Sequence, residues 1–559
     1  MLSLQKLIKF KMQKHVVSVL SFGLLSISSS AQWTNNSTIN TPVAIATKGQ
    51  SNMHMVTDNA NGVILAWEDN RDNLTNSTDI YAQRIDKNGV AKWATNGVAL
   101  CNNASLQKSV VMVDAGNGAM IAAWQDLRAG NSDIYAQKID SLGNVLWAVN
   151  GVAVTNKTTT QKNVKLISDN AGGAIIVWED SVNSYYDIYA QRLNSAGVAQ
   201  WASNGVVVCN ATLLQINPKI DTDNAGGAII TWQDKRNGND YDIYAQRINN
   251  AGIAQWASNG VVVCNATGTQ NNPRIEPDGA NGAIIAWADK RNTIDYNIYA
   301  QRISATGTAI WANNGVAVCT ATDAQSGIDM KFLGTTILVS WKDVRSGNYQ
   351  IYSQLLNLQG VPQLATNGIA LSNNSLKAIN PNTIVDSNGG AIVAWQDSVA
   401  GNWNIKTQQL SNLGALQWAT GGVVVSNAAN NQINVAQVSN GLGGAIFGWE
   451  DNRSGIDYDI YTQNITNNGI LNSVQAPTTN NTTIIAYPNP VHDVLRLTNV
   501  ALNSTTTIYT TAGAIVYYAN SSTSITNEIN CTLFNNGLYF YTITSENKIQ
   551  KGKFIIDNN

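Results

Sequence analysis

The chain contains 559 residues, with 34 lysines and arginines against 36 aspartates and glutamates, which gives a formal net charge of −2. This length is sufficient for several domains or for one long repeat array. The near balance of charge excludes a polyanion-binding surface, so we expect no nucleic-acid partner.

Residues 1–31 have the features of a secretory signal peptide. Four lysines precede a short apolar run at 16–27, and small residues follow it. A basic region, a short apolar core and a small-residue site predict export, with cleavage between Ala31 and Gln32. No other segment approaches the ~20 apolar residues that a transmembrane helix needs.

The region after this signal is an internal repeat. A tryptophan that ends a consecutive apolar run recurs eight times, at 67, 124, 178, 232, 287, 341, 395 and 449. Each unit of about 54 residues contains four short strand-like segments separated by tight turns rich in Asn and Gly. Nothing in the units has the periodicity of a helix.

A four-stranded sheet that is apolar on both faces must pack between copies of itself, which favours a β-propeller over the alternative, a β-solenoid. The last unit lacks its fourth segment after residue 472, and the stretch that begins at Gln32 resembles that missing segment. We therefore predict an all-β fold in which an eight-bladed propeller of four-stranded blades spans 32–470 and is closed by its N-terminal strand.

Most aromatic and sulfur-containing residues follow the repeat and are expected in the core. Fifteen of the sixteen tryptophans occupy two repeat positions, whereas Trp403 lies off the pattern in a predicted loop and is a candidate ligand-binding residue. Four cysteines follow the second tryptophan by eight residues, where other units have Thr or Ser: Cys101, Cys209, Cys264 and Cys319. This exchange predicts small buried residues, although an oxidising compartment leaves disulfide pairing open.

Two polar positions also repeat. An Asp stands two residues after the first tryptophan in all eight units, and an Arg follows two residues later in six, with Val182 and Val399 in the third and seventh. We interpret the pair as a turn device, since eight equivalent acids supply no pair of unlike groups for catalysis. A glutamine precedes the first strand of seven units, and four of these are candidate ligand-binding amides at a channel mouth: Gln107, Gln161, Gln215 and Gln270. The alternative is that they bond the backbone of the neighbouring blade.

The repeats offer no catalytic or metal motif. We find no Ser-His-Asp set, no zinc spacing and no phosphate-binding loop, and only Glu276 and Asp329 are acids off the pattern near inner strands. The segment "DTDNAGG" at 221–227 resembles part of the calcium loops of integrin-type propellers, but calcium requires more carboxylates. We expect no catalytic residue, no metal and no cofactor, with calcium as the alternative.

The C-terminal residues 484–559, after a linker at 471–483, predict a small β-sandwich. Their motifs are "YPNP" (Tyr487, Pro488, Asn489, Pro490), Gly513, Gly537 with Tyr539, and Lys548 with Lys551. This region resembles the C-terminal sorting domain of type IX secretion cargo from Bacteroidota, although Thr510 stands where that family usually has Asp. The resemblance implies the type IX translocon as a partner, followed by release or coupling to surface lipopolysaccharide.

Taken together, the patterns predict a secreted or outer-membrane cell-surface protein, monomeric, that has a binding or structural role. Its propeller loops would recognise a protein or a glycan. The alternative is a polysaccharide-active enzyme, a glycosidase or lyase, with its site in the propeller channel.

Overall fold

The computed structural model describes residues 32–72, 77–182, 184–373, 376–473, 484–498, 500, 503–521, 526–545 and 548–558. The predicted signal peptide with Ala31, and the linker from 474 to 483, lie outside the described residues. The chain divides into two compact units at residue 474. Within the described residues, no helix is long and apolar enough to cross a membrane.

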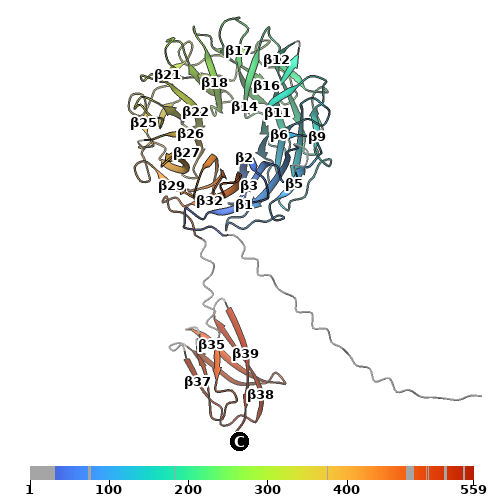
Figure 1. Ribbon diagram of the computed structural model, residues 1–559, viewed down its shortest axis with the longest axis vertical. Helices are drawn as coiled ribbons and strands as arrows, with labels where there is room; N and C mark the ends of the chain where they lie inside the picture. The colour runs from blue at the N-terminus through green and yellow to red at the C-terminus, as the bar shows by residue number, and fades with distance from the viewer. Residues whose placement is uncertain are drawn as a thin grey trace, which may run out of the picture. The chain divides into compact units, whose positions relative to one another are not determined.

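The first unit contains eight four-stranded antiparallel sheets arranged in a ring (Figure 1). The inner strands are β2 (Gln50–Thr57), β6 (Gln107–Asp114), β10 (Gln161–Ser168), β14 (Gln215–Thr222), β18 (Gln270–Pro277), β22 (Gln325–Phe332), β26 (Ala378–Val385) and β30 (Gln432–Ser439). The second strands are β3 (Val63–Asp69), β7 (Met120–Asp126), β11 (Ala174–Val182), β15 (Ala228–Asp234), β19 (Ala283–Asp289), β23 (Thr336–Asp343), β27 (Ala391–Val399) and β31 (Ala445–Asp451).

The third strands are β4 (Asp79–Ile85), β8 (Asp133–Ile139), β12 (Tyr185–Leu193), β16 (Asp242–Ile248), β20 (Asn297–Ile303), β24 (Gln350–Asn357), β28 (Asn402–Leu410) and β32 (Asp459–Ile465). The outer strands are β5 (Val98–Cys101), β9 (Val152–Thr155), β13 (Val206–Cys209), β17 (Val261–Cys264), β21 (Val316–Cys319), β25 (Ile369–Ala370), β29 (Val423–Ser426) and β1 (Thr41–Ala44). Blades I to VII each take four consecutive strands, starting with β2–β5, and blade VIII combines β30–β32 with β1.

The apolar second strands form the interior of the ring wall. Every residue of β15, for example, is buried, because both faces of its sheet are covered by neighbouring blades. The inner strands contact one another in order around the ring, and β30 contacts β2. The predicted eight-bladed propeller is therefore confirmed.

The ring is closed by the N-terminal strand, as predicted. Strand β1 pairs with β32, with Thr41 opposite Thr462. Trp33 is buried, and its Nε1 donates a hydrogen bond to the carbonyl of Lys87 in blade I at 2.7 Å. Gly89 has a positive φ of 83°, and a Cβ there would meet the Trp33 main chain at 2.6 Å. Closure thus depends on a tryptophan packed directly against a glycine turn.

Blades III and VII have a different turn between their second and third strands. Strands β27 and β28 are nine residues long, against seven in most blades, and Val399 pairs with Asn402. The two residues between them, Ala400 and Gly401, both have positive φ, as a type I′ hairpin turn requires. Strands β11 and β12 of blade III are also nine residues long.

The second unit is a two-sheet β-sandwich. One sheet has the order β33 (Ile485–Tyr487), β34 (Val494–Thr498), β37 (Thr526–Asn530), and the other β36 (Ile515–Ser521), β35 (Ser504–Thr510), β38 (Gly537–Ser545), β39 (Lys548–Ile556). Leu495 and Leu497 of the first sheet share a buried core with Ile508, Tyr541 and Phe554 of the second.

Candidate functional site

The repeated aspartates are part of the packing of each blade. Asp234 accepts a hydrogen bond from Trp232 Nε1 at 2.8 Å and forms a two-pronged ion pair with Arg236, at 2.9 Å and 2.6 Å. The Arg236 guanidinium lies over the Tyr244 ring, 3.8 Å from its centre, and donates to the Asn259 carbonyl. The predicted turn device is confirmed, and it also fixes the tryptophan.

Blades III and VII, which lack this arginine, neutralise the same aspartate with a lysine from elsewhere. In blade III, Lys157 from the loop that enters the blade lies 2.9 Å from Asp180. In blade VII, Lys406 lies 3.2 Å from Asp397. The buried carboxylate therefore has a cationic partner in every blade.

The candidate glutamines Gln107, Gln161, Gln215 and Gln270 are fully buried within the blade wall. Each Nε2 donates to a carbonyl of the loop that enters its blade, for example from Gln161 to Thr159 at 2.7 Å. The main-chain N–H of Gln161 donates to Ser132 of the preceding blade. The amides therefore tie the entry loop to its own blade, whereas the bond to the preceding blade is a main-chain bond that Ala378 also makes in blade VII.

Trp403, the other candidate, is half-buried. The prediction that it lies in a loop is wrong, because the hairpin of blade VII is extended and places Trp403 in β28 opposite Ser398. Its main-chain N–H donates to the Asn431 side chain at 3.0 Å.

The four repeat cysteines are buried, as the exchange with Thr and Ser predicted, and the structure shows them unpaired. The thiol of Cys209 lies beside the Asp234–Arg236 pair, with Arg236 Nη2 at 3.3 Å. Burial raises the pKa of this thiol to about 12, so Cys209 is an inert core residue at neutral pH.

The side chains that break the eightfold repeat lie on the inner strands. Eight positions pair with the residue that precedes each blade's first tryptophan, and we call them the axial ring: His54, Val111, Lys165, Lys219, Arg274, Asp329, Asn382 and Ala436. The positions two residues later form a second ring: Val56, Val113, Ile167, Asp221, Glu276, Lys331, Ile384 and Val438. Charged residues occur only in blades III to VI, since His54 is neutral near pH 7.

Four members of the axial ring line one cavity of about 440 Å³: His54, Arg274, Asn382 and Ala436. The remaining wall is rich in amides, including Asn52, Asn380, Gln396 and Asn434. Burial, with a contribution from Lys165, lowers the pKa of His54 to about 4, so this imidazole is uncharged at neutral pH.

The two acids noted in the sequence, Glu276 and Asp329, both belong to these rings but already have partners. Glu276 pairs with Lys331 and accepts the Phe332 N–H at 3.3 Å. Burial nevertheless raises the pKa of Glu276 to about 7. Asp329 accepts the Thr383 N–H at 2.6 Å, and burial raises the pKa of its carboxyl above the usual range.

Sequence reasoning missed the four cations of these rings, Lys165, Lys219, Arg274 and Lys331. Each is one charged residue of an inner strand, at a position where the residue type varies among the blades. Counting four positions on from the repeated glutamine of a unit reaches Lys165, Lys219 and Arg274, and counting six positions reaches Lys331.

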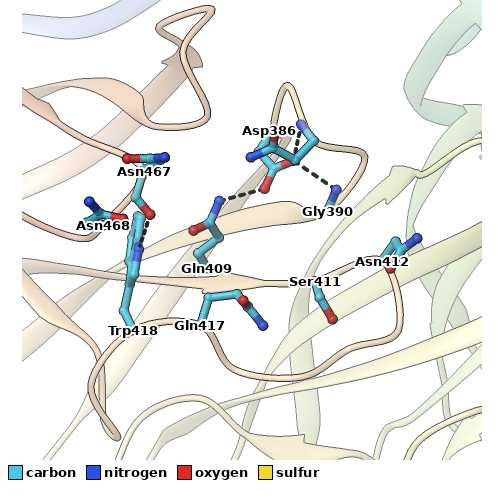
Figure 2. Close-up of a pocket in the computed structure, with 10 residues that line it drawn as sticks. Asp386, Gly390, Gln409, Ser411, Asn412, Gln417, Trp418, Asn467 and Asn468 are labelled. Carbon is cyan, nitrogen blue, oxygen red and sulfur yellow. Dashed lines mark hydrogen bonds between the residues drawn. The ribbon is translucent and has the colours of Figure 1, made fainter.

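A second cavity, of about 410 Å³, lies between blades VII and VIII (Figure 2). In blade IV the corresponding Arg247 pairs with Asp223 at 2.9 Å and reaches the next blade at Ala305. Blade VII has the shorter Gln409, which donates to Asp386 at 2.6 Å (Figure 2). It also donates to the Gly443 carbonyl at 3.0 Å. This cavity follows from the loss of a long side chain.

The turn that resembles a calcium loop uses its carboxylate internally. Asp223 accepts the N–H groups of Ala225 and Gly227 through one oxygen and pairs with Arg247 through the other. The described residues contain no group of three or more His, Cys, Asp or Glu side chains that could hold a metal. A calcium ion at this turn would have to displace Arg247.

Several of the sorting-motif residues make contacts within the C-terminal sandwich. The Tyr487–Pro488 and Asn489–Pro490 bonds are cis, and Asn489 Oδ1 accepts the Ile555 N–H of the last strand at 2.8 Å. At the turn after β35, Gly513 has a φ of 82°. The Thr510 hydroxyl accepts the Ala514 N–H at 3.2 Å, a bond that an Asp could also accept.

The other motif residues lie on the final hairpin. Tyr539, two residues after Gly537, is buried, stacks on Phe554 and donates its hydroxyl proton to the Asn535 carbonyl at 2.9 Å. Lys548 begins β39, and Lys551 is exposed on that strand.

Residues 485–557 match the family described as the secretion system C-terminal sorting domain. No curated protein matches the sequence. Among solved structures, the chain is similar to PorZ, a surface component of the type IX secretion system of Porphyromonas gingivalis, at 12% identity over 91% of this chain and 70% of that chain, with a TM-score of 0.28.

It is also similar to a protein of unknown function from Dyadobacter fermentans, at 8% identity over 65% of this chain and 95% of that one, with a TM-score of 0.33. A thermostable family-43 glycoside hydrolase matches at 11% identity over 49% of this chain and 98% of its own, with a TM-score of 0.28. The propeller assignment itself rests on the strand pairing. With its C-terminal sorting domain, the protein is a type IX secretion cargo that is exported to the cell surface or beyond.

Proposed function

We propose that this cargo is a glycan-binding protein whose propeller holds its ligand at the axial ring. The observation that carries the proposal is that the charged side chains of the two rings all belong to blades III to VI, and that one of them, Arg274, lines a cavity of about 440 Å³ whose wall also includes Glu450. Positions that serve packing recur around the ring, whereas these do not. The ligand is thus expected at the axis of the propeller and not at the loops that the sequence suggested.

The cavity wall supports a carbohydrate ligand. Asn52, Asn380, Gln396 and Asn434 supply amides. Asn380 Nδ2 already donates to Gln396 Oε1 at 2.9 Å, and Asn52 Nδ2 donates to Glu68, so it is the remaining amide atoms that can bond sugar hydroxyls. Met53 and Ile328 add apolar surface for the sugar ring face. A few polar groups on a largely preformed concave wall are typical of small-ligand sites.

The sorting domain adds the type IX translocon as a partner. After export, the propeller would act either in free form or coupled to surface lipopolysaccharide. In both cases the binding site faces the outside of the cell.

A polysaccharide-active enzyme is the second candidate, and one observation favours it. The pKa of Glu276, about 7, suits a general acid. Against it, Glu276 and Asp329 are both occupied by partners from neighbouring blades, and neither carboxylate lines the cavity.

A glycan array combined with chromogenic glycosides tests both functions on the mature protein. We expect binding to a restricted set of glycans and no turnover. Cleavage of any glycoside that is lost in Glu276→Gln or Asp329→Asn, but kept in Asp323→Asn on an exposed loop, would establish the enzyme instead. Absence of binding to every glycan would overturn the proposed function.

A further inference from the structure

The arginines of this protein are almost all engaged by carboxylates. Eleven of the twelve form an ion pair with an Asp or Glu. Among the described residues Arg274 is the exception, and its only hydrogen bond there is a long contact of 3.4 Å from Nη1 to the carbonyl of its neighbour Pro273. Arg274 also lines the axial cavity.

Two more cations stand at the same level on the preceding inner strands. Lys219 in blade IV and Lys165 in blade III form no ion pair within the described part of the chain, and Lys165 Nζ donates only to the Val164 carbonyl at 2.9 Å. Burial, together with the charges of Arg274 and Lys165, lowers the pKa of Lys219 to about 7. The three cations therefore repel one another in a half-buried site.

The acids around these cations are committed elsewhere. Asp329 at the same level accepts the Thr383 N–H, and Glu276 in the second ring pairs with Lys331. Glu179, which attracts Lys165 and Lys219, accepts hydrogen bonds from Asn163 and from the Asn217 main chain. Asp329 still attracts Arg274 at longer range, and Glu450 lies in the same cavity wall, but none of these acids forms an ion pair with the three cations in the described part of the chain.

We propose that Arg274, Lys219 and Lys165 form the anion-binding part of the axial site, and that the ligand is a saccharide bearing carboxylate groups. Resting on the proposed function, the inference names the glycan class: Arg274 would bind a uronate carboxylate while the amides of the cavity bind the sugar hydroxyls. A guanidinium is suited to such two-pronged recognition of carboxylate, and the lysines add point charges.

Calorimetric titration of the mature protein with trigalacturonate, with neutral galactotriose and with inorganic sulfate tests the inference. We expect trigalacturonate to bind at least about tenfold more tightly than galactotriose, and Arg274→Gln to weaken it by about tenfold or more. Lys219→Gln should weaken it less, and Lys87→Gln, an exposed lysine of blade I, should change nothing.

The outcomes separate the inference from the function on which it depends. Equal binding of the neutral and acidic sugars, unaffected by Arg274→Gln, would keep a glycan-binding propeller and overturn the anion site. Binding of sulfate alone, lost in Arg274→Gln, would keep the anion site and overturn the saccharide. No binding of any probe would overturn the inference, whatever a glycan array showed.

Two further readouts distinguish a binding role from a structural one. Removal of an unpaired, repelled cation should leave the melting temperature unchanged or higher, so a large fall in Arg274→Gln would make Arg274 structural and contradict the proposal. Affinity for trigalacturonate should also fall from pH 6 to pH 8, because Lys219 loses its proton and Glu276 gains a negative charge in that window. His54 is uncharged throughout. Burial also raises the pKa values of Asp221, Asp329 and Glu450, and ionisation of any of these carboxyl groups lowers the affinity for an anion.

Discussion

Blades III and VII hold the aspartate beside the first tryptophan with a lysine, whereas the other six blades hold it with the arginine of the following turn. The two kinds of blade have different turns and different sources of positive charge. The aspartate and the tryptophan are the same in both. The fold therefore requires a neutralised carboxylate at this place and tolerates several ways of supplying the cation.

The largest effect is expected from removing the arginine in a blade where an arginine neutralises the aspartate. Arg236→Met leaves Asp234 buried without a counter-charge, which should cost about 3–5 kcal/mol of stability. The change should appear as a lower melting temperature and as faster hydrogen exchange in β15 and β16. Lys235→Met, at the neighbouring position of the same turn, is the control, and an equal effect there would contradict the account.

Removal of the lysine that neutralises the aspartate in blade III should have a smaller effect. Lys157→Met in blade III removes a single ammonium contact, which is weaker than the two-pronged guanidinium contact of the other blades. A loss of about 2–3 kcal/mol of stability is therefore expected. Hydrogen exchange of β11 and β12 reports the loss locally. If Asp180 tolerates the change with no measurable loss, its charge needs no partner and the comparison between blades fails.

A third change should stabilise the protein. Burial, with the nearby Asp234 charge, raises the pKa of Asp242 to about 6, whereas an unfolded Asp titrates near about 4. The folded state holds this proton more tightly, so stability is lost as pH rises from about 4 to about 6 and stays low above it. Asp242→Asn should then gain about 1–2 kcal/mol at pH 7 and nothing at pH 3.5.

Blade V provides a natural precedent for that change, since Asn297 occupies the equivalent place opposite Asp289. Melting curves at the two pH values check the prediction. A destabilised variant at pH 7 would show that the carboxylate of Asp242 has a favourable role that burial alone does not describe.

The smallest effect concerns the cysteines. Cys264→Ser should change stability by less than about 1 kcal/mol, because Ser372 and Ser426 already fill the same position in other units. The melting temperature should also be the same with and without a reducing agent. A marked fall on reduction would reveal disulfides and contradict the buried, unpaired thiols.

Much of the fold could be predicted from the sequence because the residues that pack the ring are repeated. The spacing of Trp67 and its seven counterparts marks the second strands, and the segment from Gln32 completes the last blade. The predicted loop position of Trp403 is wrong because blade VII lacks the Asp-x-Arg turn and has a longer hairpin. The spacing of the tryptophans does not show the type of turn.

The candidate site could not be predicted in the same way. Its residues are those that do not repeat, so Lys219 and Arg274 stand out only when each unit is counted from its repeated glutamine, and the strand pairing then confirms that they lie at one level. The glutamines were singled out because they repeat, and repetition marked packing: their amides are buried against the entry loops.

Hydrogen exchange of the mature protein with and without trigalacturonate tests the central claim, that the ligand binds at the axis. The account predicts that protection on binding is confined to the inner strands β10, β14, β18 and β22 and to the other strands that line the cavity, which are β2, β26, β27, β30 and β31. Protection confined to outer loops, such as the blade VII hairpin around Trp403, with the inner strands unchanged, would contradict it.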